Sequence, residues 1–401
     1  MQKKKILLFG AGKIGRSFIG QLFGRSGYEI VFADIDPRIV GLINETASYK
    51  VITVDNNHPE KEGKYTVKNV SALLLSETEK IIENIVDCDI MALSVGKRGL
   101  LSLSEMLAAG LSKRYKVRKD SPVDIILAEN VRDAADLLRV ELKKHAAGFP
   151  LDDYVGLVET SIGKMVPIMT KEQLNSDPLA VVAESYNSLI VDTLGFRNTI
   201  PEVEGLAPKK NMKAWVDRKI FIHNLGHAVL SYQANYSNPK LEYIWEALEV
   251  TQLKDITRKT MLQSMEILMA LYPDEFTEEQ LIDHIDDLLD RFSNRSLGDT
   301  IFRVGCDLSR KLNKDDRLMV PIIAGIKTKK EYSLILDAWV KGCFFKATDK
   351  NGNMTKEDEK FKKDFGENPL HYLSCDFDGK EYSEIYDGVH VILEKMNFKQ
   401  Q

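Results

Sequence analysis

The sequence predicts an α/β domain at the N-terminus followed by a mainly α-helical C-terminal domain. An apolar run at residues 6–9 has the pattern of a buried strand and ends in a glycine-rich turn, after which a helical pattern begins. Long segments with apolar residues at helical spacing fill much of the second half. A chain of 401 residues exceeds what one hydrophobic core usually serves, so we expect two domains, residues 1–205 and 206–401.

The glycine-rich turn follows the first predicted strand, Ile6 to Phe9, and reads Gly10-Ala11-Gly12-Lys13-Ile14-Gly15. Between a strand and a helix, the pattern G-x-G-x-x-G predicts a dinucleotide site. The first glycine permits the turn, the second lets a pyrophosphate approach the backbone, and the third lets the helix pack closely. Amides at the helix N-terminus, near Lys13 and Ile14, would bind the phosphates. The first domain is therefore predicted to be of the Rossmann type.

An acidic residue follows the second predicted strand, Glu29 to Ala33. Asp34 stands at the distance from the glycines where an acid binds the adenosine ribose. A carboxylate there accepts hydrogen bonds from both ribose hydroxyls and repels a 2′-phosphate, so NAD is expected rather than NADP. Asp36 is the neighbouring alternative.

The loops after the other predicted strands are candidates for ligand contacts, because ligands of open α/β sheets bind beyond the carboxyl ends of the strands. Val95 and Gly96 would let the cofactor pass close to the backbone, or would form an ordinary strand exit. Asn130 would donate to a substrate oxygen, or would cap the helix that begins near Arg132. The strands concerned are Ile90 to Val95, Val123 to Ala128 and Tyr154 to Glu159.

The second half begins after a glycine- and proline-rich connection at Thr193 to Lys210. A helix predicted at residues 214–232 would place an amine, an amide and two imidazoles within an arc of roughly 140° on one face. The side chains concerned are Lys219, His223, Asn224 and His227. Further helices are predicted at Tyr243 to Tyr272 and Glu279 to Phe292.

This polar face has the groups needed to oxidise an alcohol with NAD, a reaction in which a base must take the hydroxyl proton. Lysine can act as the base if burial and nearby positive charge lower its pKa. A zinc site at His223 and His227 is an alternative, but no third ligand or cysteine stands close by, so no metal is expected. A second alternative is a buried helix whose Lys219 reaches solvent.

Composition excludes other classes of protein. A net charge of −5 argues against a dedicated nucleic-acid binder, so a small-molecule substrate is expected. The four cysteines are scattered without a C-x-x-C pair, which favours a reducing compartment and hence the cytoplasm. The basic start of the chain lacks the rest of a signal peptide. No run of about 18 apolar residues is present, so no membrane span is predicted.

Lys219, Asn224 and His227 stand in the order K-x4-N-x2-H. This order is similar to that of the polyol-specific long-chain dehydrogenases, the mannitol dehydrogenase family. Further matching segments extend over most of the chain, and the last is most similar to members that act on mannitol 1-phosphate. They are GAGKIGRSFIG at Gly10 to Gly20, AEN at Ala128 to Asn130, DRKIFIHNLGHA at Asp217 to Ala228, and RFSNRSLGD, RVG and RKLNKDDRLMVP between Arg291 and Pro321.

The resemblance implies a metal-independent enzyme, a monomer like many relatives, that uses NAD to interconvert a hexitol phosphate and a ketose phosphate, mannitol 1-phosphate and fructose 6-phosphate. It implies Lys219 as general acid/base and His227 as the residue that orients substrate. Asn130 and Asn224 would polarise the carbonyl. The basic block offers Arg303, Arg310 and Lys311 for the substrate phosphate, with Arg317 as a further candidate, or these side chains pair with Asp307, Asp315 and Asp316 on the surface.

The chain departs from the family pattern at three places, which leaves the substrate open. Gly163-Lys164 stands where an Asp-Arg pair is usual, His223 where an apolar residue is usual, and Ser293 to Arg295 replaces a pattern ending in proline. Alternatives within the family are a mannitol 2-dehydrogenase and a hexuronate (altronate or mannonate) oxidoreductase. An alternative of another class is a catalytically silent NAD-binding protein.

Overall fold

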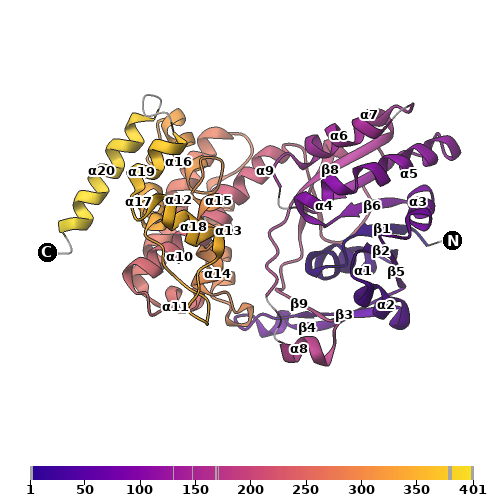
Figure 1. Cartoon of the computed structure of the whole chain (residues 1–401), viewed down its shortest axis with the longest axis horizontal. Coiled ribbons are helices and arrows are strands. Elements are labelled where there is room, and N and C mark those ends of the chain that lie inside the picture. Colours follow the sequence, from indigo (N-terminus) through magenta and orange to yellow (C-terminus); the bar gives the residue numbers. More distant parts are fainter. Residues whose placement is uncertain are drawn as a thin grey trace. The chain divides into compact units, whose positions relative to one another are not determined.

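The computed structural model of the chain describes residues 3–129, 131–146, 148–167, 169, 171–377 and 382–398. The chain forms two compact units, Met1–Val216 and Asp217–Gln401, which we call the sheet unit and the helical unit (Figure 1). The sequence placed the division at residues 205 and 206. In the structure Leu206–Lys209 still forms a strand of the first unit, so the chain leaves the sheet after that strand.

An eight-stranded sheet forms the centre of the sheet unit, in the order β11-β10-β8-β7-β6-β1-β2-β5. Neighbouring strands are parallel except β10 and β8. From β5 to β8 the strands follow the 3-2-1-4-5-6 order of a Rossmann fold, so the order reverses between β1 and β6. The strands are β1 (Lys5–Phe9), β2 (Glu29–Asp34), β5 (Val70–Leu74), β6 (Ile90–Leu93), β7 (Val123–Leu127), β8 (Val155–Ser161), β10 (Leu189–Asp192) and β11 (Leu206–Lys209).

Side chains of β1 alternate between two cores because the sheet is covered on both faces. Ile6 and Leu8 are fully buried with residues of η1, α1 and α2, whereas Leu7 and Phe9 are fully buried with residues of α3, α5 and α6. A parallel sheet buried on both sides requires continuous apolar strands, which explains why this run was recognisable in the sequence. These helices are η1 (Gly15–Gly20), α1 (Gln21–Arg25), α2 (Pro37–Thr46), α3 (Thr78–Asp87), α5 (Ser104–Val117) and α6 (Ala134–His145).

The fold class predicted from the sequence is confirmed, and so are the five predicted strands. The sequence did not predict β5, β10 and β11 of the large sheet or the separate three-stranded sheet β4-β3-β9. Pro208 lies in β11, an edge strand, where the missing amide hydrogen is tolerated. The additional elements are β3 (Ser48–Thr53), η2 (Pro59–Lys61), β4 (Gly63–Lys68), α4 (Gly96–Ser102), α7 (Leu151–Tyr154), α8 (Lys171–Ser176), β9 (Val181–Ala183) and η3 (Thr193–Gly195).

The helical unit contains no named strand among the residues described from 217 onward. Its central helix, α10, packs against α12, α14 and α17. The fully buried indole of Trp339 in α17 donates a 2.9 Å hydrogen bond to the carbonyl oxygen of Leu312. The helices are α10 (Leu225–Ser237), α11 (Ile244–Glu249), α12 (Thr251–Leu271), α13 (Glu278–Phe292), η5 (Arg295–Leu297), α14 (Ile301–Gly305), α15 (Leu308–Lys311), α16 (Met319–Thr328), α17 (Ser333–Cys343), α18 (Lys356–Phe365), α19 (Pro369–Asp376) and α20 (Ser383–Phe398).

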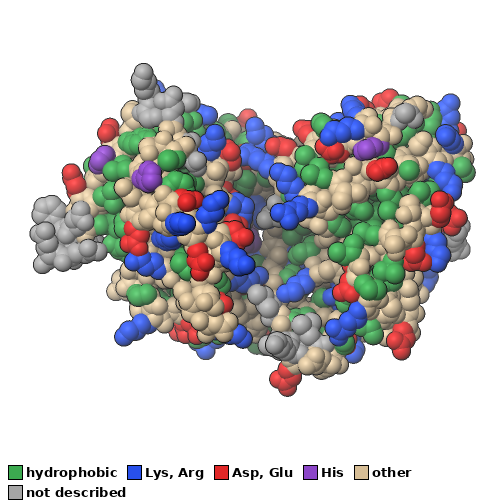
Figure 2. All heavy atoms as spheres, viewed as in Figure 1, with side chains coloured by type: hydrophobic (Ala, Val, Ile, Leu, Met, Phe, Trp, Pro, Cys, Tyr) green, Lys and Arg blue, Asp and Glu red, His purple; other side chains and the backbone are tan. Residues whose placement is uncertain are grey.

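Basic and acidic side chains are interspersed on the face of each unit that Figure 2 shows. Such mixing is typical of a solvated surface rather than of a surface that tracks a nucleic-acid backbone. In the described part of the chain, no helix combines the length and apolar character needed to cross a membrane.

Candidate active site

The three glycines of the turn after β1 have different surroundings. Gly10 has φ +96°, and a Cβ there would lie 2.2 Å from the carbonyl oxygen of Ser94. A Cβ at Gly15 would lie 2.0 Å from the carbonyl oxygen of Gly10. Around Gly12, by contrast, no described atom lies within 4 Å of an added Cβ. The turn and the close helix packing therefore use the first and third glycines, and the second borders open space, as the predicted approach of a pyrophosphate requires.

Asp34 faces the glycine-rich turn. Its carboxylate accepts a 2.6 Å hydrogen bond from the amide of Ala11 and a 2.9 Å hydrogen bond from the amide of Asp36. The carboxylate of Asp36 instead accepts from the amides of Arg38 and Ile39 and caps α2. The geometry therefore favours Asp34 over Asp36 for contact with a cofactor.

A buried carboxylate joins the loops after β6 and β7. Glu129 accepts hydrogen bonds from the amides of Val95, at 2.7 Å, and of Gly96, at 2.9 Å. Burial raises the pKa of Glu129, and these two hydrogen bonds oppose that shift. The amides of Val95 and Gly96 are thus already paired, so any cofactor contact there would involve their carbon atoms or carbonyl groups. Asn130, the next residue, lies outside the described residues.

Sequence reasoning overlooked Glu129. Two sequence features could have indicated its role. Glu129 directly follows a predicted strand, and the loop after the neighbouring strand contains Gly96, where a helix begins with amides that can donate to a carboxylate. Lys13, a predicted cofactor contact, directs its Nζ to the carbonyl oxygen of Pro167 at 3.1 Å. Ile14 is partly buried and packs against the core on the η1 face of the sheet.

The helix predicted at residues 214–232 is interrupted by a π-helical turn, which corrects the assumption of regular α-helical spacing. The chain passes from α9 (Met212–Arg218) through η4 (Lys219–Asn224) into α10. In an α-helix, residues five apart point about 140° away from each other, whereas a π-helix bonds residue i to i+5 and brings them together. The π turn therefore places Lys219 and Asn224 on the same side of the helix.

Lys219 has the electrostatic surroundings of a proton-transfer group. Burial, and then the positive charge of Arg317, lower the pKa of Lys219 to about 8. Arg317 is largely buried, and its Nε donates a 2.7 Å hydrogen bond to Asp316. An amine with such a pKa exchanges protons near neutral pH, as a general acid/base must.

The two histidines after Lys219 are held neutral. Burial lowers the pKa of His223 well below its ordinary value, and the proximity of His227 lowers it further. Burial and the charges of Arg317, Arg303 and Lys311 do the same to His227. In the described part of the chain, no three His, Cys, Asp or Glu side chains are grouped so as to hold a metal ion. A metal-independent reaction stays a prediction.

The basic block separates into two environments. Arg303 lies on α14 and pairs with Asp299, while Lys311 on α15 donates a 2.7 Å hydrogen bond from its Nζ to the carbonyl oxygen of Val304. Both charges act on His227, as described above. Arg310 instead forms ion pairs with Asp307 and Asp316, at 2.5 and 3.1 Å. The surface-pairing alternative therefore describes Arg310 well and Lys311 poorly.

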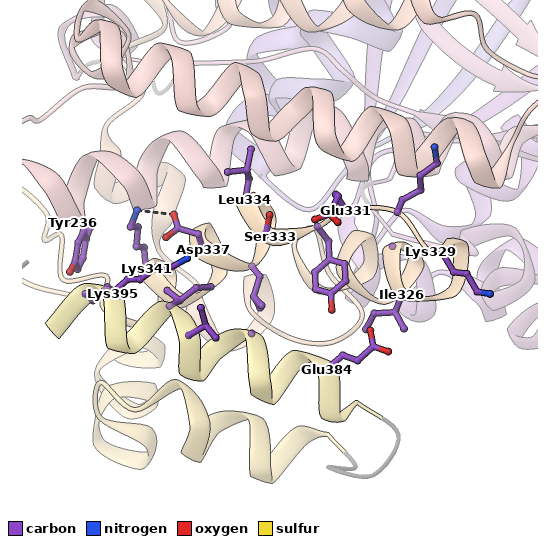
Figure 3. Close-up of a pocket in the computed structure, with 18 residues that line it drawn as sticks. Tyr236, Ile326, Lys329, Glu331, Ser333, Leu334, Asp337, Lys341, Glu384 and Lys395 are labelled. Carbon is purple, nitrogen blue, oxygen red and sulfur yellow. Dashed lines mark hydrogen bonds and ion pairs between the residues drawn. The ribbon is translucent and has the colours of Figure 1, made fainter. Parts of the chain in front are cut away.

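A separate cavity of about 1110 Å³ lies in the helical unit, lined mainly by the end of α16, by α17 and by α20 (Figure 3). On its wall, Lys341 donates a 2.7 Å hydrogen bond to Asp337 and a 2.8 Å hydrogen bond to Gln233. None of the predicted site residues lines this cavity. This cavity is therefore distinct from the candidate active site, which lies on η4 and α10.

A Rossmann-type unit with a carboxylate after its second strand, followed by a helical unit that carries a lysine of lowered pKa, has the groups that an NAD-dependent dehydrogenase needs. Residues 4–205 match the mannitol dehydrogenase Rossmann domain, and residues 211–369 match the mannitol dehydrogenase C-terminal domain. The chain belongs to the mannitol dehydrogenase family.

Curated relatives support this assignment. The chain is 34% identical over 317 residues to mannitol-1-phosphate 5-dehydrogenase of Geobacillus stearothermophilus, covering 78% of this chain and 80% of the relative. It is 30% identical over 352 residues to the enzyme of the same name from Lactococcus lactis, covering 87% of this chain and 88% of that one. The similarity thus extends through both units.

Solved structures share the fold. A substrate-free D-sorbitol dehydrogenase superposes with a TM-score of 0.78 at 17% identity, covering 97% of this chain and 92% of the other. Mannitol 2-dehydrogenase of Pseudomonas fluorescens, in complex with NAD and D-mannitol, gives a TM-score of 0.72 at 15% identity, covering 98% and 95%. At these identities the comparison establishes the fold.

Proposed function

We propose that the protein catalyses the NAD-dependent interconversion of a hexitol phosphate and a ketose phosphate, with mannitol 1-phosphate and fructose 6-phosphate as the pair. The observation that carries this proposal is Lys219, whose pKa is lowered to about 8, on the same side of a π turn as Asn224. The names of the two curated relatives support the choice of substrate.

The proposed proton transfer uses Lys219. In the oxidation direction its neutral amine takes the proton of the reacting hydroxyl, and in the reduction direction its ammonium returns that proton. The positive charge of Arg317 favours the neutral amine, which is the form that oxidation needs. Bound NAD would accept the hydride, with its pyrophosphate beside Gly12 and its ribose at Asp34.

The proposed substrate contacts use neutral donors. Amides of Asn224 and Asn130 would donate to the oxygen on which negative charge develops, because fixed dipoles stabilise such charge without reorganising. His227 would contact another hydroxyl, and its neutral imidazole has both a donor and an acceptor nitrogen for that purpose.

The proposed phosphate contacts are Arg303 and Lys311, with Arg317 as a third cation. These are the charges that act on His227, and of the three Lys311 and Arg317 are largely buried whereas Arg303 is exposed. Burial, and then the charge of Arg317, lower the pKa of Lys311 to about 8, which a bound phosphate dianion would reverse. Arg310 is a poorer candidate because two carboxylates already neutralise it.

A substrate panel tests the proposal through the nicotinamide absorbance. Mannitol 1-phosphate with NAD and fructose 6-phosphate with NADH should turn over, and the unphosphorylated forms should turn over far more slowly. Equal turnover of free mannitol or of hexuronates would favour the alternatives within the family. NADH binding without turnover of any polyol or ketose would favour a silent binding protein.

We further propose that the protein acts as a monomer in the cytoplasm. The structure holds Cys88 and Cys343 as buried free thiols, and burial raises the pKa of Cys88 to about 12, so that it resists oxidation. Light scattering coupled to size exclusion tests the oligomeric state. A mass near 45.4 kDa supports the monomer, and twice that mass contradicts it.

A further inference from the structure

The imidazole of His227 has a buried nitrogen, Nε2, that forms no hydrogen bond with any residue that the structure describes. A buried nitrogen without a partner costs free energy, and a substrate hydroxyl would remove that cost. Among the described contacts of this ring, packing is therefore the one that can orient it.

Phe292 supplies that packing. The rings of His227 and Phe292 are stacked, with centroids 3.7 Å apart and planes 18° apart. Such close and nearly parallel stacking resists rotation of the imidazole about its Cβ–Cγ bond, because that rotation would turn the ring out of the stacked plane. Neutral imidazole is the form that burial and the nearby cations impose on His227.

Phe292 is itself held in place. It is the last residue of α13 and is 2% exposed. Its ring also lies 5.6 Å from the ring of His223, which in turn meets His227 nearly edge-on at 5.5 Å and 72°. Each of the three rings thus packs against the other two, and His223 contacts both His227 and Phe292.

We infer that Phe292 is a positioning residue for His227, whose plane it fixes so that the unpaired Nε2 is presented to a hydroxyl group of the substrate. The inference rests on the proposed function, in which His227 contacts the polyol. Phe292 does not touch the reacting atoms in this scheme, and it acts only through His227. Ordinary core packing is the competing explanation for so buried a side chain.

A double-mutant cycle separates the two explanations. Phe292→Leu keeps an apolar side chain but removes the flat ring, and it should raise KM for the polyol phosphate about 2- to 12-fold while the affinity for NADH is unchanged. In a His227→Ala background the same substitution should add nothing, because the residue through which it acts is gone. Phe292→Tyr keeps the flat ring, so its KM for the polyol phosphate should stay near that of the wild type.

Phe361→Leu is the matched control. Phe361 is also 2% exposed, but it lies on α18 among Phe365 and Tyr372. The Phe361→Leu variant should lower Tm about as much as Phe292→Leu does, and its KM for the polyol phosphate should equal that of the wild type. Should Phe292→Leu fail to fold, Phe292→Met takes its place in the cycle. A rise in KM of equal size with and without His227, or no rise at all, overturns the inference.

A spectroscopic readout keeps this test independent of turnover. In protein labelled with ¹⁵N-histidine, the ring signals of His227 are identified by their loss in His227→Ala. They should be sharp in the wild type and should shift or broaden in Phe292→Leu but not in Phe361→Leu. If no polyol or ketose phosphate turns over, the proposed function fails, and unchanged His227 signals in Phe292→Leu overturn the positioning role separately.

Discussion

The amide of Ala11, inside the glycine-rich turn, donates a 2.6 Å hydrogen bond to the carboxylate of Asp34 at the end of the neighbouring strand. The two strands pair in register from Lys5 with Glu29 to Phe9 with Ala33, so the turn and the acid meet at one edge of the sheet. The position proposed for the ribose is therefore fixed by the same pairing that forms the turn proposed for the pyrophosphate.

Asp34→Ala should weaken NADH binding by roughly 10-fold or more, because a hydrogen bond to a charged group contributes about 1.5–3 kcal/mol. It should also reduce the preference for NAD over NADP, since the repulsion of a 2′-phosphate is lost. Fluorescence titration with both cofactors measures each effect. Asp36→Ala is the control: it should lower the free energy of unfolding by about 0.5–2 kcal/mol through loss of the α2 cap and keep the preference. A changed preference in the Asp36 variant alone would reverse the assignment.

Turnover should depend on pH through Lys219. The neutral amine is the active form for oxidation, so kcat/KM for the polyol phosphate should rise as pH increases through about 8. Reduction needs the ammonium and should fall over the same range. Lys219→Ala should remove nearly all turnover and leave NADH binding intact, whereas Lys213→Ala, on the exposed side of α9, should change neither. A flat profile in both directions would exclude a lysine as the proton-transfer group.

Arg317→Met should move that profile. Removing a positive charge beside Lys219 favours its protonated form, so the pKa of Lys219 rises and the oxidation limb shifts to higher pH. Arg310→Met is the matched control, since Arg310 is paired with Asp307 and Asp316 and does not act on Lys219. The measurement is the pH profile of kcat/KM for the wild type and for both variants. An equal shift in both variants would mean that general charge, and not Arg317, sets the pKa.

Lys311→Met should reduce kcat/KM for mannitol 1-phosphate by roughly 10- to 100-fold, as expected for a lost contact between two charged groups. Turnover of free mannitol, however slow, should change little. The ratio of the two substrates is the measurement, because partial unfolding affects both equally. Arg310→Met should leave this ratio near that of the wild type. If the ratio falls for Arg310 and not for Lys311, the phosphate contacts proposed above are wrong.

Glu129→Gln should loosen the loop after β6. The amide of Gly96 donates to both carboxylate oxygens, at 2.9 and 3.1 Å, and the substitution puts an NH₂ donor in place of one of them, so Gly96 loses its shorter hydrogen bond and faces a donor. Unfolding free energy should fall by about 1–3 kcal/mol. Hydrogen exchange should accelerate at Val95 and Gly96 first. Unchanged exchange at both amides would show that the carboxylate is not what orders the loop.

The sequence revealed the features that depend on short-range patterns. The apolar run of β1, its glycine turn and the acid after β2 form within one βαβ segment, so their spacing alone predicted the Rossmann-type unit. The polar face on the helix around Lys219 was also recognisable. These features share one property: the residues involved are neighbours in sequence or on one element.

Features formed by distant segments were missed. Phe292 reaches His227 from α13, and Arg317 acts on Lys219 from the basic block, and no local pattern pairs such residues. The three-stranded sheet combines β9 with β3, more than 100 residues earlier. Arg310 and Lys311 are adjacent in sequence and both are basic, so the sequence could not distinguish them. In the structure Arg310 pairs with two carboxylates, whereas Lys311 donates to a backbone carbonyl oxygen.

The π turn at Lys219–Asn224 sets how the polar side chains before and after it are oriented. A π turn holds one residue more than an α turn, so the same residues wound as an uninterrupted α-helix would place Asn224 about 140° from Lys219. Every later residue, His227 included, would then be rotated by about 100° relative to Lys219. The arrangement of the polar face thus depends on the backbone of this one turn as well as on the identity of its side chains.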